Sequence, residues 1–184
     1  MPENPSPAAV ERPTLDRETI LRAALDLMEL VGLDGLSTRR LAAELGVKGP
    51  SLYWHFRTMG ELRDHMADLL LAEVIPPPAD DWRAWLAEGA RAVRRAALSR
   101  RDAARLLAGA RPTAAGRAAR TRANLARLEA AGFGPEQARA AFLSLAHYAL
   151  GSALAEQNGE RGVDEGVFEF GLAALLVGLA ADRR

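Results

Sequence analysis

Apolar residues recur every three or four positions along most of this chain, and that spacing constrains the fold more than any other feature. Ile20, Ala24, Leu27 and Val31, for example, share one face of a helix. No segment alternates apolar and polar residues with a period of two, so we expect no β-sheet. Ala, Leu and Arg, which crowd the sequence, are strong helix formers. The sequence therefore predicts an all-α protein.

Composition excludes several functional classes. The chain of 184 residues has no cysteine, which rules out disulfides, thiolate zinc sites and cysteine nucleophiles. Its 24 basic and 24 acidic residues balance, so nucleic-acid binding has to come from the distribution of charge. No apolar run reaches membrane-span length, and residues 1–12 lack the apolar core of a signal peptide. We expect a cytoplasmic protein without membrane contact.

Proline and glycine divide the chain into helices and two larger parts. Residues 1–14 are expected to be a disordered tail, and Pro76–Pro78 form the clearest boundary because proline cannot continue a helix. The predicted parts are one unit over 15–75, including a connecting helix, and a second helical unit over 80–184. The expected helices span about 16–32, 38–45, 51–56, 61–74, 82–98, 102–108, 114–131, 136–157 and 164–181.

Residues 38–56 have the form of a helix-turn-helix. Ser37 is a suitable N-cap, Gly46 ends the first helix, and Pro50 suits the first turn of the second. By spacing alone, these could equally be two packed helices of an ordinary bundle.

The exposed residues of this segment favour DNA over simple packing. Between residues 38 and 58 stand four basic side chains and one acid, Glu44. Tyr53, Trp54 and His55 are consecutive, so a helix cannot bury all three while Leu52 and Phe56 face the core. Outward aromatic rings with polar tips beside basic residues suit phosphate and groove contacts. Packing of Tyr53 and Trp54 against the next helix or the tail is the alternative.

These residues resemble the tetracycline-repressor (TetR) family, whose DNA-binding segment is similar to LDGLSTRRLAAELGVKGPSLYWHF at 33–56. The resemblance covers roughly residues 17–157 and continues through Arg101–Asp102, Gly109–Pro112, Ala131–Phe133 and His147–Gly151. It implies a DNA-binding domain over 15–75, whose second motif helix enters the major groove, and a ligand-binding and dimerisation domain over 80–184. The residues that this resemblance assigns to DNA, together with their basic neighbours, are Thr38, Arg39, Arg40, Lys48, Pro50, Ser51, Tyr53, Trp54 and His55.

Two positions depart from the family's DNA-reading pattern. Gly49 stands where a polar, base-reading residue is expected, and Met59 replaces a phosphate-contacting lysine. Glycine has no side chain with which to read a base. The operator should therefore differ, with Lys48 taking part of the reading.

The resemblance also implies a small-molecule pocket in the second half. Its expected lining residues are Gly89, Val93, Leu107, Arg111, Pro112, Asn124, Phe142, His147 and Gly151. From the residues alone, His147 on an apolar helix face could as well be a core histidine. Eleven arginines between residues 91 and 127 could form an anionic-ligand surface, but a solvated or intersubunit-paired face is favoured.

The metal-binding pattern of the tetracycline-binding members is missing. Those members hold their drug as a magnesium chelate, but Leu107 and Ala155 replace the imidazole and the carboxylate that serve the metal, and Ile75 replaces a drug-anchoring histidine. We therefore expect a more apolar pocket, without metal or other cofactor, for a different ligand.

The expected function is a ligand-responsive transcriptional regulator, most simply a repressor. Apolar faces on the last two helices exceed what one helical layer can bury, and the family pattern implies a homodimer on a palindromic operator, released by a small, largely apolar molecule. An enzyme is not expected, because no nucleophile–base pair or carboxylate pair has a recognisable spacing. A DNA-binding adaptor that responds to a protein partner remains the alternative.

Overall fold

The structure is a computed structural model that describes residues 15–72, 74, 81–111, 113 and 116–181, with the backbone alone over 116–120. These residues form nine helices and no strand, which confirms the all-α prediction. The helices are α1 (Arg17–Gly35), α2 (Thr38–Glu44), α3 (Gly49–Tyr53), α4 (Met59–Ala72), α5 (Trp82–Leu98), α6 (Ala103–Gly109), α7 (Gly116–Ala130), α8 (Pro135–Gln157) and α9 (Glu165–Ala181). The predicted tail and the proline boundary at 76–78 lie outside the described residues.

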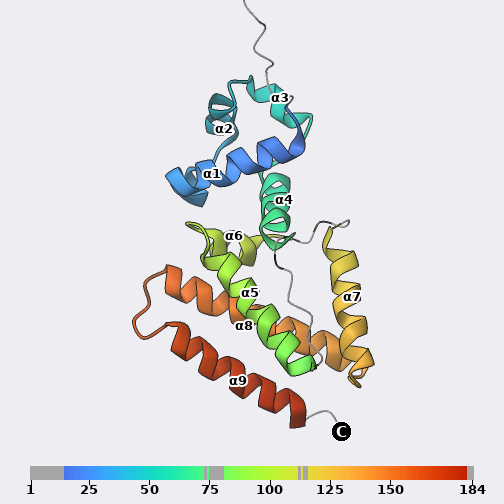
Figure 1. The fold of residues 1–184 in the computed structure, drawn as a ribbon. Coiled ribbons are helices and arrows are strands. Elements are labelled where there is room, and N and C mark those ends of the chain that lie inside the picture. The colour runs from blue at the N-terminus through green and yellow to red at the C-terminus, as the bar shows by residue number, and fades with distance from the viewer. Residues whose placement is uncertain (1–14, 73, 75–80, 112, 114–115, 182–184) are drawn as a thin grey trace, which may run out of the picture.

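The helices are arranged as a small N-terminal group joined by α4 to a larger C-terminal group (Figure 1). Helices α1 to α3 lie at one end of the molecule, and α4 leads from them toward α5 and α6. Helices α5 and α8 pack along each other in the larger group, with α7 against α8 and α9 against both.

Two apolar cores hold these groups together. One contains Ile20, Leu41 and Met66 from the N-terminal group and continues into α6 through Leu106. The other joins α5, α7, α8 and α9 around Trp85 and Phe168. The first core therefore connects the two groups of helices and does not stop between them.

Helix ends follow the capping residues that the sequence indicated, with some differences. Asp16 Oδ1 accepts a hydrogen bond from the Thr19 N–H at 2.7 Å, and Asp81 caps α5 in the same way. The first helix was expected to end at Gly32. This residue does leave the helical conformation, with φ +74°, but a helical turn resumes beyond it and α1 runs on to Gly35.

The third helix is shorter than predicted and begins earlier. It spans Gly49–Tyr53 in place of 51–56, although the Phe56 N–H still donates to the Leu52 carbonyl oxygen at 3.0 Å and Phe56 is buried, 5% exposed. Helix α4 begins at Met59, two residues earlier than expected, since Thr58 Oγ1 accepts the Glu61 N–H at 3.0 Å.

Part of the arginine-rich stretch pairs with acids of the same chain. Four of its arginines form ion pairs with acids elsewhere in the same chain: Arg91–Glu169, Arg94–Glu156, Arg100–Asp26 and Arg105–Asp34. The favoured solvated face therefore holds for Arg100 and Arg105, whose side chains are 36% and 47% exposed, whereas the Arg94 side chain is only 10% exposed. None of the described helices is both long enough and apolar enough to cross a membrane.

Candidate nucleic-acid interface and ligand cavity

The helix-turn-helix is built as its capping residues indicate. Ser37 Oγ accepts the Arg40 N–H at 3.4 Å, and Gly46 ends α2 with φ +64°. Lys48 precedes α3 and Pro50 lies in its first turn. Leu41 and Leu52 are buried between α2, α3 and α1.

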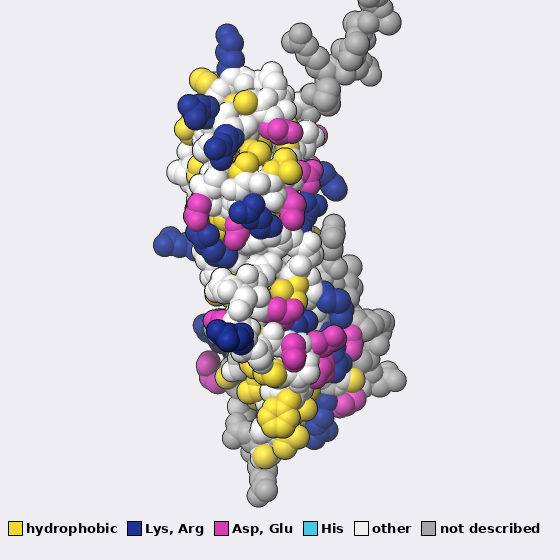
Figure 2. All heavy atoms as spheres, turned by 90° about the vertical axis from the view of Figure 1, so that its left-hand side faces the viewer, with side chains coloured by type: hydrophobic (Ala, Val, Ile, Leu, Met, Phe, Trp, Pro, Cys, Tyr) yellow, Lys and Arg dark blue, Asp and Glu magenta, His cyan; other side chains and the backbone are white. Residues whose placement is uncertain are grey.

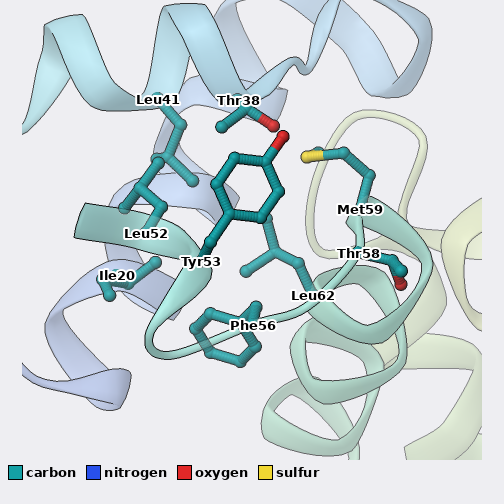
Figure 3. Close-up of a pocket in the computed structure, with 9 residues that line it drawn as sticks. All are labelled: Ile20, Thr38, Leu41, Leu52, Tyr53, Phe56, Thr58, Met59 and Leu62. Atoms are coloured by element: carbon teal, nitrogen blue, oxygen red, sulfur yellow. The ribbon is translucent and has the colours of Figure 1, made fainter. Parts of the chain in front are cut away.

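The aromatic run on α3 faces outward. Trp54 is 90% exposed and Tyr53 is 56% exposed, while His55 is half-buried. Figure 3 shows the Tyr53 ring beside Thr38 of α2 and Met59 of α4. The hollow that these side chains line has a volume of about 20 Å³. That space holds about one water molecule, so it is part of the packing and no ligand site. Tyr53 thus packs against α4 and is still exposed, whereas Trp54 is almost fully exposed.

The remaining residues assigned to DNA lie around these aromatics. Arg39, Arg40, Lys48 and Pro50 are exposed, and Thr38 and Ser51 are half-buried. Arg40 also donates from Nη1 to the Gly35 carbonyl oxygen at 3.0 Å. The structure places all nine residues on or beside α2 and α3, at the end of the molecule farthest from α9 (Figure 1).

A support for α3 was missed by the sequence analysis. Arg17 of α1 donates to the His55 carbonyl oxygen at 2.5 Å, and its guanidinium lies over the Phe56 ring at 4.3 Å. Glu61 Oε2 accepts the Arg57 N–H at 2.7 Å. These contacts fix the segment that follows α3, and no motif in the sequence signals them.

A cavity of about 400 Å³ lies among α4, α5, α6, α7 and α8. Six of the nine residues expected to bind a ligand line it: Gly89, Val93, Leu107, Asn124, Phe142 and His147. Arg111 and Gly151 are not among the described lining residues, and Pro112 lies outside the described part of the chain. Arg111 is exposed instead, and its backbone N–H donates to Asp64 Oδ1 at 2.7 Å.

Other lining residues were not singled out from the sequence. They are Leu71, Val74, Trp85, Leu86, Ala90, Ala108, Ala110, Thr121, Leu143, Leu145, Ala146 and Leu150. A signal existed for Thr121, because it lies three residues before Asn124 and so shares its helix face. None of the described lining residues is an acid or an arginine or lysine. Across the described residues, no three His, Asp or Glu side chains are grouped closely enough to hold a metal ion.

The turn between α5 and α6 is bound to the C-terminal end of α1. Asp102 has the left-handed φ of 59°, and its Oδ2 accepts the Leu33 N–H, which follows the break at Gly32, at 2.7 Å. Glu29 Oε2 accepts the Arg101 N–H at 2.8 Å. Helix α6 runs from this contact to the cavity, which Leu107 lines. One short helix thus touches both the cavity and the DNA-binding group.

Helix α9 is fixed to the molecule through Tyr148 and Arg91. The Tyr148 ring stacks on Phe168 with centroids 5.5 Å apart, and a Cβ at Gly171 would lie 2.0 Å from the Tyr148 hydroxyl oxygen. Arg91 binds both carboxylate oxygens of Glu169, at 2.7 and 2.6 Å. This pairing, together with the neighbouring arginine charge, holds the pKa of the Glu169 carboxyl below its ordinary value. Burial raises the pKa of Tyr148, and the Glu169 charge adds to that rise.

The opposite face of α9 is apolar and exposed. Phe170 is 79% exposed, Val177 71% and Val167 51%. In Figure 2 hydrophobic side chains gather over the lower part of the molecule, on the side where α9 lies in Figure 1. Isolated exposed apolar residues are ordinary, but several on one helix face indicate an interaction surface.

Comparison with known protein families matches both groups of helices. Residues 20–66 match the family model described as bacterial regulatory proteins, tetR family, and residues 75–166 match the tetracyclin repressor-like C-terminal domain. The chain is 43% identical over 155 residues to the tetracycline repressor protein class A from transposon 1721 of Escherichia coli, covering 82% of this chain and 71% of that protein.

Solved structures of TetR proteins are also similar to this chain. A TetR variant from Acinetobacter baumannii AYE in complex with minocycline is 39% identical with a TM-score of 0.84, covering 92% of this chain and 99% of that one. TetR class A in complex with 5a,6-anhydrotetracycline and magnesium is 42% identical with a TM-score of 0.79, covering 92% of this chain and 100% of that one. With a helix-turn-helix at one end and a cavity-bearing helical group at the other, the chain belongs to the TetR family of ligand-regulated transcriptional repressors.

Proposed function

We propose that this protein binds a palindromic operator as a homodimer through α2 and α3, and that a small, largely apolar molecule in the 400 Å³ cavity releases it. The proposed DNA contacts are the nine residues already described on and beside α2 and α3. Its place of action would be the cytoplasm.

Helix α4 is the single observation that carries this proposal. Its first turn packs against α3, where Met59 and Leu62 lie next to Tyr53. Its last turn, through Leu71, forms part of the cavity wall. A ligand in the cavity therefore contacts one end of α4, and DNA whose major groove holds α3 acts on the other end. The ligand can shift the protein only by its difference in affinity for the DNA-bound and released forms.

A homodimer supplies the second recognition helix. The exposed apolar face of α9, with Val167, Phe170 and Val177, offers a surface that a second copy of the chain would bury. Two copies of α3 would then meet half-sites about 34–36 Å apart in successive major grooves. Because Gly49 has no side chain, base reading would depend on Arg39 and Lys48, for which an arginine–guanine pair is the natural contact.

Gel-shift titration of the gene's own promoter DNA tests the DNA side of the proposal. Affinity should fall steeply with salt, since phosphate contacts release counterions. The double variant Arg39→Ala, Tyr53→Ala should lose specific binding, while Arg95→Ala, on the exposed surface of α5, should not. Equal operator affinity of the Arg39/Tyr53 double variant and the unchanged protein would refute the assignment.

An adaptor controlled by a protein partner is the second candidate function. The exposed face of α9 favours it, because a different protein could cover the same residues. A melting-temperature screen over apolar metabolites and antibiotics separates the two. A ligand that raises the melting temperature and releases the promoter supports the small-molecule mechanism, and sensitivity to a protein alone supports the adaptor.

A further inference from the structure

The lining of the 400 Å³ cavity is divided into an apolar wall and a polar edge. Helices α4, α5 and α6 contribute only apolar residues and glycine to it, among them Leu71, Trp85 and Leu107. The described polar lining residues are Thr121 and Asn124 on α7 and His147 on α8, where they stand beside apolar residues of α8. Among the described lining residues, hydrogen-bonding side chains other than the Trp85 indole therefore come from α7 and α8 alone.

The polar edge carries no fixed charge in the described residues. It offers a hydroxyl, a carboxamide and an imidazole, each of which can both donate and accept hydrogen bonds. Thr121 and Asn124 are half-buried and share one face of α7, whereas His147 is exposed and lies toward solvent. Neutral polar groups of a ligand can be satisfied here, whereas the described lining offers an ionised group no charged side chain in return for its lost hydration.

From this division we infer that the effector is an uncharged, largely apolar molecule whose polar atoms lie along one edge, and that it binds without a divalent cation. The inference rests on the proposed function, in which the cavity is the effector site. The apolar body would lie against α4, α5 and α6, and the polar edge would face Thr121, Asn124 and His147.

A magnesium chelate of the kind found in the class A relative does not fit the donors present. Mg²⁺ takes oxygen ligands in octahedral geometry and is usually held through carboxylates. The described lining has no carboxylate, and Leu107, which is 4% exposed, presents hydrocarbon to the cavity. The ligand class should therefore differ from that of the tetracycline-binding relatives, although the fold is shared.

Two dyes that differ by one negatively charged sulfonate group test the inference. The neutral probe is 1-anilinonaphthalene and the anionic probe is its 8-sulfonate, both followed by their fluorescence on titration with the full-length protein. The neutral dye should bind at least about tenfold more tightly. Neither EDTA nor MgCl₂ should change that affinity. Val93→Trp fills the cavity and should abolish tight binding, whereas Ala84→Trp, exposed on the same helix, should not.

Asn124→Lys tests whether the missing charge sets the preference. A lysine on the polar edge should raise the affinity for the sulfonate by at least about tenfold and leave the neutral dye within about threefold, because only the anion gains a partner. The matched variant is Ala123→Lys, on the exposed side of the same helix, which should change neither dye.

Several results would overturn the inference. The first is a sulfonate affinity of the unchanged protein that equals the neutral-dye affinity and disappears in Val93→Trp. The second is a neutral-dye affinity that Val93→Trp leaves unchanged. The third is a sulfonate affinity that Asn124→Lys leaves unchanged. Anhydrotetracycline that binds tightly only with MgCl₂ would overturn it too. If that chelate also released promoter DNA, the proposed function would stand while this inference fell. Absence of promoter binding would refute the proposed function whatever the dyes did.

Discussion

The contact between Asp102 and α1 gives the sharpest quantitative prediction. Two terms contribute to the effect of Asp102→Ala on the free energy of unfolding. The first is the charge-assisted hydrogen bond from the Leu33 N–H at 2.7 Å, worth about 2 kcal/mol because the part-buried donor loses its acceptor. The second is the left-handed φ of 59°, which costs alanine about 1 kcal/mol more than aspartate. Together they predict a loss of about 3 kcal/mol.

Substitutions at the same position separate these terms. Asp102→Asn keeps an acceptor and tolerates the left-handed conformation, so it should cost less than about 1 kcal/mol. Asp102→Gly relieves the backbone but loses the hydrogen bond, and should cost about 2 kcal/mol.

Urea and thermal unfolding followed by circular dichroism measure this series. For a chain of this size, about 3 kcal/mol corresponds to a fall of about 6–12 °C in melting temperature. The expected order of stability is wild type, asparagine, glycine, alanine. Equal melting temperatures for the wild type and Asp102→Ala, or a glycine variant less stable than alanine, would refute the reasoning.

Three further predictions concern α9. Gly171→Ala places a methyl group 2.0 Å from the Tyr148 hydroxyl oxygen, so it should cost about 1–3 kcal/mol in thermal unfolding, and Tyr148→Leu in the same chain should recover part of the loss. The pKa of Glu169 is lowered in the folded state, so the ion pair with Arg91 stabilises above the pKa of the unfolded glutamate and is lost as pH falls through the lower, folded value. Arg91→Met should therefore flatten the decline of stability below about pH 4, and an unchanged acid limb would contradict this. Phe170→Asp, at a side chain 79% exposed, should yield monomers in sedimentation and lose operator affinity without a large change in melting temperature, and a persistent dimer would rule out this face.

Local features of the fold could be predicted because their causes are local. Ser37, Gly46 and Pro50 act within a few residues of their own position, and they set the helix-turn-helix correctly. The helical spacing of apolar residues likewise sufficed for the all-α fold. Helix ends were predicted only to within a few residues, since α3 begins at Gly49 and α4 at Met59, each two residues earlier than expected.

Contacts between distant segments could not be read from the sequence. Asp102 and Leu33 are 69 residues apart, and no sequence pattern indicates that the Asp102 carboxylate accepts the Leu33 N–H at the break in α1. The same holds for Arg17 beneath His55, 38 residues away. The ion pairs of the arginine-rich stretch could not be predicted for this reason, since their acids lie in other helices.

The cavity was predictable in part. Five residues carried over from the family pattern on α5, α7 and α8 do line it, namely Gly89, Val93, Asn124, Phe142 and His147, but Gly151 on α8 does not. Arg111 does not, since it lies beyond the end of α6 and its backbone is held outward by Asp64. The wall that α4 provides was missed because Leu71 looks like any other apolar residue of an amphipathic helix.

The apolar face of α9 also has a consequence for temperature. From Gly166 to Ala181 the only ionisable side chain is Glu169, which is bound to Arg91 within the same chain. Association through such a face is driven by entropy near 25 °C and weakens on cooling, unlike association through ion pairs and hydrogen bonds. If two copies join there, cold should favour monomers, and genes under this regulator's control should be repressed less firmly at low temperature than at high.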